Sequence, residues 1–80
     1  MIPREGQRIG EFYIEVAEYS RHLGNKLLPE PAFGVWAIHD DGTEIFIGVP
    51  YKQADKPESE WLKLLREEYQ RCKPHIGKEF

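Results

Sequence analysis

The first third of the chain has apolar residues at helical spacing. From about 8 to 28, at 100° per residue, one arc is apolar and the opposite side is mostly acidic. A strand over 11–16, with Phe12, Ile14 and Val16 alternating, is the competing interpretation, but it ends at Ala17. The pattern favours an amphipathic helix over 8–28, ended by the prolines that follow. Its apolar arc holds Ile9, Phe12, Tyr13, Val16, Ala17, Tyr19, Leu23 and Leu27.

The middle of the chain has the composition of two β-strands. The segments 33–39 and 43–51 are rich in aromatic and β-branched residues. Between them stands Asp40-Asp41-Gly42, which is typical of a hairpin turn. We therefore expect an antiparallel β-hairpin here.

The turn type decides which hairpin residues share a face. A two-residue turn at Asp41 and Gly42 places Ala37 opposite Phe46. In that register both faces are apolar, whereas a hairpin with one wet face would alternate apolar with polar residues. One face then carries Trp36, Ile38, Ile45, Ile47 and Val49, and the other carries Phe33, Val35, Ala37 and Phe46.

A second helix is marked at both ends. After the polar linker 52–56, Asp55 and Glu58 have the spacing of a capping box, with Pro57 in the first turn. Pro74 is expected to stop the helix. One side of this segment is apolar, as an amphipathic helix requires. That side holds Trp61, Leu62, Leu64, Leu65, Tyr69 and Cys72.

These elements predict an α+β domain with the order helix, β-hairpin, helix (αββα). It spans 1–80 as a single domain, with tails at 1–7 and 74–80. Two strands alone make a marginal sheet, and two helices cover one face of a hairpin more easily than both. We therefore expect the sheet to be completed by a terminal strand, by a second copy of the chain in a homodimer, or by another protein added at its edge.

The composition is that of a small globular domain from a reducing compartment. The chain has 80 residues, of which 40% are hydrophobic and 31% charged. Its single cysteine, Cys72, excludes an internal disulfide, which favours the cytoplasm. No segment approaches the ~18 apolar residues of a membrane span, and no apolar core follows the charges at the start. We therefore expect neither membrane insertion nor export.

Neither the charge nor the motifs indicate catalysis, a metal or a cofactor. The net charge of −3 is unlike that of a general phosphate-backbone binder. Cys72 and His75 have the spacing of half a zinc site, but the chain has no second cysteine. No nucleophile motif and no glycine-rich phosphate loop occurs. The sequence therefore favours a non-enzyme that binds no metal or cofactor.

The candidate binding surface is one face of the hairpin. Phe33, Val35, Ala37 and Phe46 form a contiguous apolar surface in the predicted register, and such a surface usually marks an interface. The alternative, equally supported, is that a helix or the C-terminal tail covers this face from within the chain.

Two further candidates lie on the predicted helices. Glu68 falls inside the apolar arc of the second helix, where its pKa could be raised or it could bind a partner's arginine. The alternative is that Glu68 reaches water at the end of that arc. Ile14 stands alone on the acidic side of the first helix, which would leave it exposed.

Three functions are consistent with these patterns. The leading hypothesis is a small non-catalytic protein-binding module, an inhibitor, adaptor or accessory subunit, acting through its hairpin face or edge. The second is a small enzyme or ligand-binding protein with Glu68 as ionisable group and a pocket lined by Tyr13, Tyr19, Trp36, Trp61 and Tyr69. The third, less favoured because acidic residues are interleaved, is weak nucleic-acid binding through the basic C-terminal third. That segment contains Lys52, Lys56, Lys63, Arg66, Arg71, Lys73 and Lys78.

Overall fold

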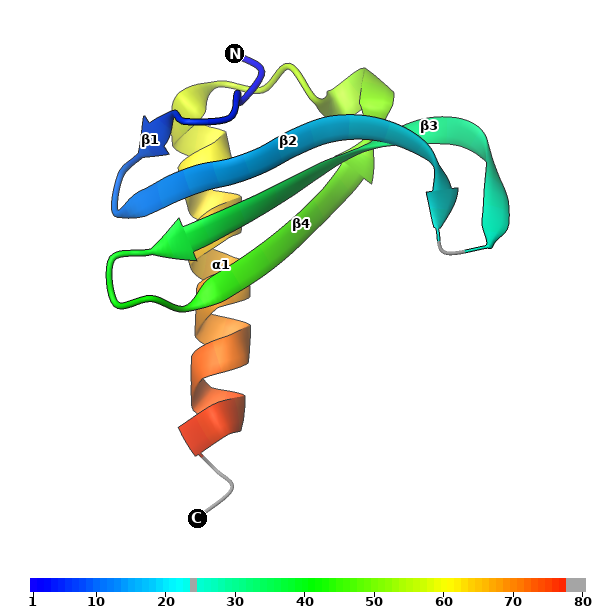
Figure 1. Ribbon diagram of the computed structural model, residues 1–80. Coiled ribbons are helices and arrows are strands. Elements are labelled where there is room, and N and C mark those ends of the chain that lie inside the picture. The colour runs from blue at the N-terminus through cyan, green and yellow to red at the C-terminus, as the bar shows by residue number, and fades with distance from the viewer. Residues whose placement is uncertain (24, 78–80) are drawn as a thin grey trace.

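The computed structural model describes residues 1–23 and 25–77. Four antiparallel strands in the order β1-β2-β3-β4 curl into a half-barrel, and one α-helix lies across one side of it (Figure 1). The elements are β1 (Arg8–Ile9), β2 (Phe12–Leu23), β3 (Lys26–His39), β4 (Glu44–Pro50), the 3-10 helix η1 (Tyr51–Gln53) and α1 (Glu58–Gly77).

The predicted helix over 8–28 is wrong, and with it the αββα order, because this segment forms β1, β2 and the start of β3. A β-bulge explains the misleading pattern. The pairing of β2 with β3 shifts between Ile14 and Val16, so one extra residue lies in β2. Phe12 and Ile14 before the bulge therefore share a face with Ala17 after it. A strand that changes phase in this way imitates helical spacing.

The β3–β4 hairpin is confirmed, but its turn is one residue longer than predicted. The His39 N–H donates to the Thr43 carbonyl oxygen over 2.8 Å, which closes a three-residue loop over 40–42. Within it the Gly42 N–H donates to the His39 carbonyl oxygen, also over 2.8 Å. Gly42 has a φ of 93°, a conformation that side chains disfavour, as the last residue of such loops requires.

The longer turn shifts the hairpin register by one residue. Phe46 lies opposite Trp36, and Ala37 lies opposite Ile45. Because side chains alternate along a strand, this shift moves Phe46 from the face of Ala37 to the face of Trp36, and it moves Ile45 and Ile47 to the face of Ala37. The predicted apolar face is therefore split, with Phe46 on the other side of the sheet from Ala37.

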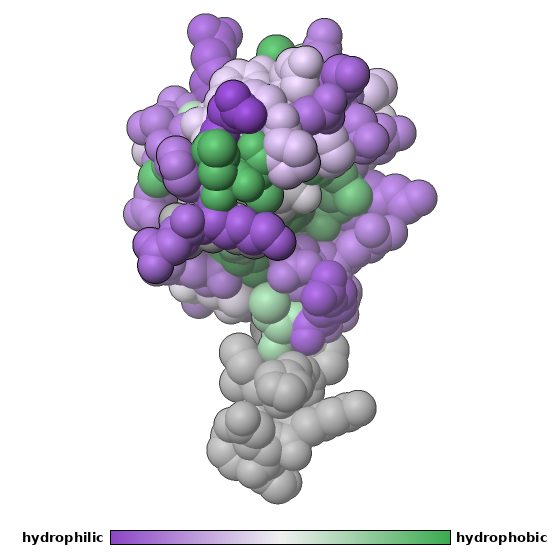
Figure 2. Space-filling model, turned by 90° about the vertical axis from the view of Figure 1, so that its right-hand side faces the viewer, coloured by the Kyte–Doolittle hydropathy of each residue, from purple (hydrophilic) through white to green (hydrophobic). Residues whose placement is uncertain are grey.

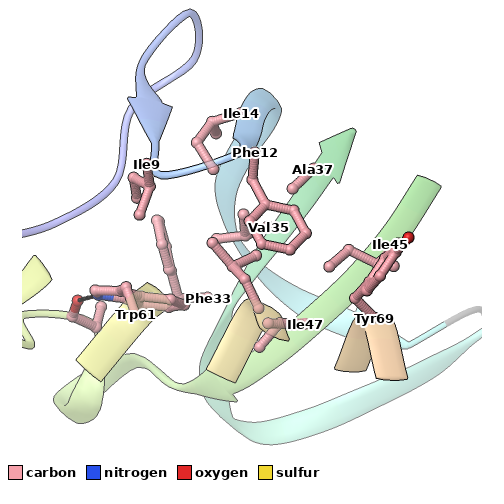
Figure 3. Close-up of a cluster of buried hydrophobic side chains, with 12 residues drawn as sticks. Ile9, Phe12, Ile14, Phe33, Val35, Ala37, Ile45, Ile47, Trp61 and Tyr69 are labelled. Carbon is pink, nitrogen blue, oxygen red and sulfur yellow. Dashed lines mark hydrogen bonds between the residues drawn. The ribbon is translucent and has the colours of Figure 1, made fainter. Parts of the chain in front are cut away.

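The core lies between α1 and the side of the sheet that faces it, here called the inner face. Trp61 of α1 is fully buried, and its indole N–H donates to the Ala54 carbonyl oxygen over 3.1 Å. Figure 3 shows Trp61 beside Phe33 at one end of the cluster and Tyr69 beside Ile45 at the other. The inner face consists of Ile9, Phe12, Ile14, Phe33, Val35, Ala37, Ile45 and Ile47.

The second predicted helix is confirmed as α1, but α1 does not end at Pro74 as expected. It begins at Glu58, in the predicted first turn, and continues past Pro74 to Gly77. Residues 78–80 of the expected tail lie outside the described residues. In the described part of the chain, no helix is long and apolar enough to cross a membrane.

Residues 1–7, expected to form a tail, lie against β2. The Gly6 N–H donates to the Ile14 carbonyl oxygen over 2.8 Å, and the Ile14 N–H donates to the Gln7 carbonyl oxygen over 2.8 Å. Pro3 is fully buried. This segment therefore extends the cover of the core on the β1 side.

Candidate functional site

The side of the sheet away from α1, here called the outer face, carries an exposed aromatic pair. Trp36 on β3 and Phe46 on β4 are cross-strand partners whose ring centroids lie 4.4 Å apart at an interplanar angle of 46°. They are 39% and 44% exposed. Cross-strand aromatic contacts stabilise a hairpin, but they do not require this much ring surface to stay in water. Exposed aromatic area of this kind is typical of a contact site.

Two strand glycines lie beside the aromatic pair. Gly34 is opposite Gly48, one step along the hairpin on the same face as the rings. A Cβ atom on Gly34 would lie 3.0 Å from Cε1 of Phe46 and 3.3 Å from Cζ3 of Trp36. The rings therefore lie so close to the strand backbone that a residue with a side chain would crowd them, and glycine does not.

A hollow of about 350 Å³ opens next to the rings, here called the outer hollow. Gly34 and Gly48 are cross-strand partners, here called the glycine row. Glu18 of β2 pairs with Gly34 and is the next residue of this row on the β2 side. Among the described residues that line the hollow, Glu18 has the only carboxylate, and none is a lysine or arginine. The outer hollow is lined by Glu18, Ser20, His22, Leu28, Ala32, Gly34, Trp36, Phe46 and Gly48.

The molecule has a hydrophobic area at the end to which the β2–β3 hairpin extends. Figure 2 views the molecule from this side and shows hydrophobic side chains enclosed by hydrophilic ones. Leu27 of β3, near the end of this hairpin, is 59% exposed. Exposed apolar surface therefore also occurs on the extended β2–β3 hairpin.

Strand β4 is an open edge of the sheet. It stands last in the strand order, and among the described strands it pairs with β3 alone. Hydrogen-bonded pairs alternate along an antiparallel ladder, and His39 with Thr43 is one such pair. The backbone groups of Glu44, Phe46 and Gly48 therefore point away from β3, toward the open side. Such a row of backbone groups can pair with a further strand.

A polar cluster fastens the β3–β4 turn to α1. The Tyr69 hydroxyl donates to Oδ2 of Asp41 over 2.5 Å, and the Asp41 N–H donates to Nδ1 of His39 over 3.1 Å. The His39 ring stacks on Tyr69, with centroids 4.0 Å apart. Sequence reasoning missed this cluster, because Tyr69 is 28 residues from Asp41 and was expected on the apolar side of a helix or in a pocket with Glu68. These contacts hold the β3–β4 turn against α1 and therefore have a structural role.

A second fastening joins the β1–β2 turn to α1. The Arg66 guanidinium donates through Nε and Nη2 to both carboxylate oxygens of Glu11, over 2.9 and 3.0 Å. This hydrogen bonding lowers the pKa of Glu11 below its ordinary value and raises that of Arg66. Arg66 is thereby held by an acid rather than left available to a phosphate. In the same way Arg71 pairs with Glu68 at 3.0 Å, which weakens the nucleic-acid hypothesis.

The structure separates the five hairpin and strand residues that the sequence singled out. Phe33, Val35 and Ala37 are core residues under α1, between 0% and 2% exposed. Ile14, expected to be exposed on a helix, is fully buried in β2. Phe46 lies on the outer face, at the rim of the outer hollow. Phe33, Val35 and Ala37 are therefore covered by a helix of the same chain, which was the alternative to an interface.

Glu68 lies on α1 and does not line the outer hollow, but it lines a second hollow together with Phe46 and Gly48, which line both. It is partly buried, and its carboxylate pairs with Arg71. The aromatic residues expected to line a pocket with it are dispersed: Trp61 and Tyr69 belong to the core, whereas Trp36 lies on the opposite side of the sheet. The structure does not bring these residues together around Glu68.

Sequence reasoning missed the residues that make the outer hollow with Phe46. Trp36 was assigned to the face of Ile45, and Glu18 to the acidic side of a helix. A signal was present, because Gly34 precedes Trp36 by two residues and Gly48 follows Phe46 by two. Residues two apart on a strand share a face, so each glycine predicts open backbone beside its aromatic neighbour.

Comparison with protein-family models, with curated proteins and with solved structures finds no match to this chain. Among the described residues, no group of three His, Cys, Asp or Glu side chains is placed to hold a metal ion. Function is therefore inferred from the geometry of the outer face and the open edge.

Proposed function

We propose that this chain is a small non-catalytic protein-binding module of the cytoplasm, an inhibitor, adaptor or accessory subunit that binds another protein through its hairpin. The observation that carries this proposal is the exposed Trp36–Phe46 pair, which lies where the outer hollow meets the open edge of β4. The single cysteine, unsuited to a disulfide-bonded fold, supports the cytoplasm.

The proposed mode is addition of a strand to β4. Backbone hydrogen bonds at an open edge supply affinity in this mode, and pockets for alternate side chains supply specificity. Phe46 contributes to both, because its backbone groups point to the open edge and its ring lies on the outer face. Every second side chain of an added strand would then lie on the outer face, and one of them would lie beside Phe46 at the outer hollow.

A second copy of the chain is the other occupant to test. Two β4 strands of seven residues could pair across a two-fold axis and form a homodimer. Light scattering after size exclusion, over a series of protein concentrations, distinguishes the cases. A monomer supports a foreign partner, whereas a stable dimer supports pairing of the chain with itself.

The direct test is selection from a displayed library of random linear peptides. Peptides that bind the wild-type chain should lose about tenfold or more in affinity for Phe46→Ala, because a central aromatic contact is removed. Tyr13→Ala is the matched control, since Tyr13 is also 44% exposed but does not line the outer hollow. Failure to enrich any peptide, or equal losses in the two variants, would overturn the proposal. Thermal unfolding of each variant checks that the fold is retained.

A further inference from the structure

The outer hollow combines aromatic surface with one unpaired negative charge. Trp36 and Phe46 form one side, and Glu18 stands at the other end of the glycine row. Glu18 is exposed and has no ion-pair partner among the described residues. The hollow therefore has a chemical preference of its own, beyond general apolar contact.

From this combination we infer that the outer hollow receives a lysine or arginine side chain of the bound segment, a conclusion that rests on the proposed function. The face of an aromatic ring attracts a cation, and tryptophan does so most strongly. A carboxylate at the opposite end completes the match, because a guanidinium can stack on a ring and bind a carboxylate with its rigid fork of donors. The chain's net charge of −3 further favours a basic segment.

Other side chains fit the outer hollow less well. An apolar side chain would remove water from Glu18 without giving it a partner, which is unfavourable for a charged group. An acidic side chain would be repelled by Glu18. Selectivity for a cation therefore comes from the carboxylate, while the rings provide contact area.

Arg21 and Arg71 of the chain itself make their contacts outside the outer hollow. Arg21 of β2 donates to the carbonyl oxygens of Leu28 and Pro29 over 3.3 and 3.2 Å, and it does not line the outer hollow. Arg71 pairs with Glu68 on α1. Neither arginine occupies the space between the rings and Glu18, so this space is open to a cation from a partner.

The test uses Nα-acetyl-arginine amide as probe and Nα-acetyl-norleucine amide as its neutral counterpart. Binding is followed by amide NMR shifts of Glu18, Gly34 and Gly48, in a mildly alkaline buffer in which histidines are ordinarily neutral. The arginine amide should shift these signals saturably, and the norleucine amide should bind at least about fivefold more weakly. Glu18→Gln should reduce arginine affinity by about the same factor.

Glu15→Gln is the matched control, because Glu15 is exposed on the same strand and does not line the outer hollow. It removes the same charge and should leave arginine binding unchanged. Equal binding of both probes, unchanged binding by Glu18→Gln, or an equal loss in Glu15→Gln would overturn the inference.

Failure of the inference can be told apart from failure of the proposed function, because the arginine probe requires no partner protein. Two results together would overturn the inference alone. The selected peptides would bind through Phe46 without containing a basic residue, and the arginine amide would not bind in the outer hollow. A library that yields no peptide, with arginine still bound at Glu18, would overturn the proposed function and leave the cation site.

Discussion

The two faces of the β3–β4 hairpin both carry large apolar side chains, yet they differ in what covers them. Phe33 on the inner face is 2% exposed and contacts Trp61 edge to face, with centroids 6.1 Å apart. Phe46 on the outer face is 44% exposed, contacts Trp36, and has its ring in the space that a side chain on Gly34 or Gly48 would enter. The same residue type is therefore core on one face and surface on the other.

The difference shows how one helix divides the sheet. Helix α1 has a single apolar stripe, so it covers one face of the sheet and leaves the other to water. On the covered face, the described side chains include no buried polar atom without a hydrogen-bond partner. On the uncovered face, Gly34 and Gly48 lie beside the aromatic pair and contribute no side chain. The inner face therefore supplies the buried apolar area that stabilises the fold, whereas the outer face leaves Trp36 and Phe46 partly exposed.

The largest expected effect is a contrast in stability between the two phenylalanines. Phe33→Ala should lower the free energy of unfolding by about 3–5 kcal/mol, because it leaves a cavity under α1. Phe46→Ala should lower it by about 1 kcal/mol, because it removes an exposed cross-strand pair. Urea denaturation of both variants measures the difference. Similar losses in the two variants would mean that the outer face also belongs to the core.

A smaller effect should separate the two glycines of the outer face. A Cβ on Gly34 would lie 3.0 Å from the Phe46 ring, whereas one on Gly48 would lie 3.4 Å from it, an ordinary contact. Gly34→Ala should therefore displace the ring and be less stable than Gly48→Ala, by about 1 kcal/mol or less. Thermal unfolding and near-ultraviolet circular dichroism of the Trp36–Phe46 pair measure this. Identical spectra for the two variants would contradict the close approach at Gly34.

The smallest expected effect concerns the pair that holds α1 over the inner face. The Arg66 guanidinium lowers the pKa of Glu11 in the folded chain, below its ordinary value of 4.5. Glu11 therefore stabilises the fold above that value, and the contribution is lost as pH falls through the lowered pKa. Glu11→Gln should be slightly less stable than wild type at neutral pH, since the pair is solvent-screened. Unfolding curves at several pH values should converge in acid.

Glu15→Gln is the control for this pH dependence, because Glu15 has no ion-pair partner among the described residues. Its stability relative to wild type should change little between neutral and acidic pH. A Glu11→Gln difference that persists in strong acid would show that the side chain acts through packing, and not through its charge.

Sequence by itself determined the two elements whose signals are local. The Asp40-Asp41-Gly42 turn between two β-rich segments marked the hairpin, and the apolar stripe after Pro57 marked α1. Turn chemistry and helical periodicity act within a few residues, so no distant contact was needed to recognise them. Phe46 was likewise singled out from its strand pattern.

Only the tertiary structure decided the rest. Residues 12–17 fit both a helix and a bulged strand, and pairing with β3 selects the strand. The length of the turn, two residues or three, decided whether Phe46 shares a face with Ala37 or with Trp36. The outer hollow brings Glu18 of β2 to glycines of β3 and β4, a contact between distant segments. Such pairings depend on the packing of the whole chain, which local patterns do not encode.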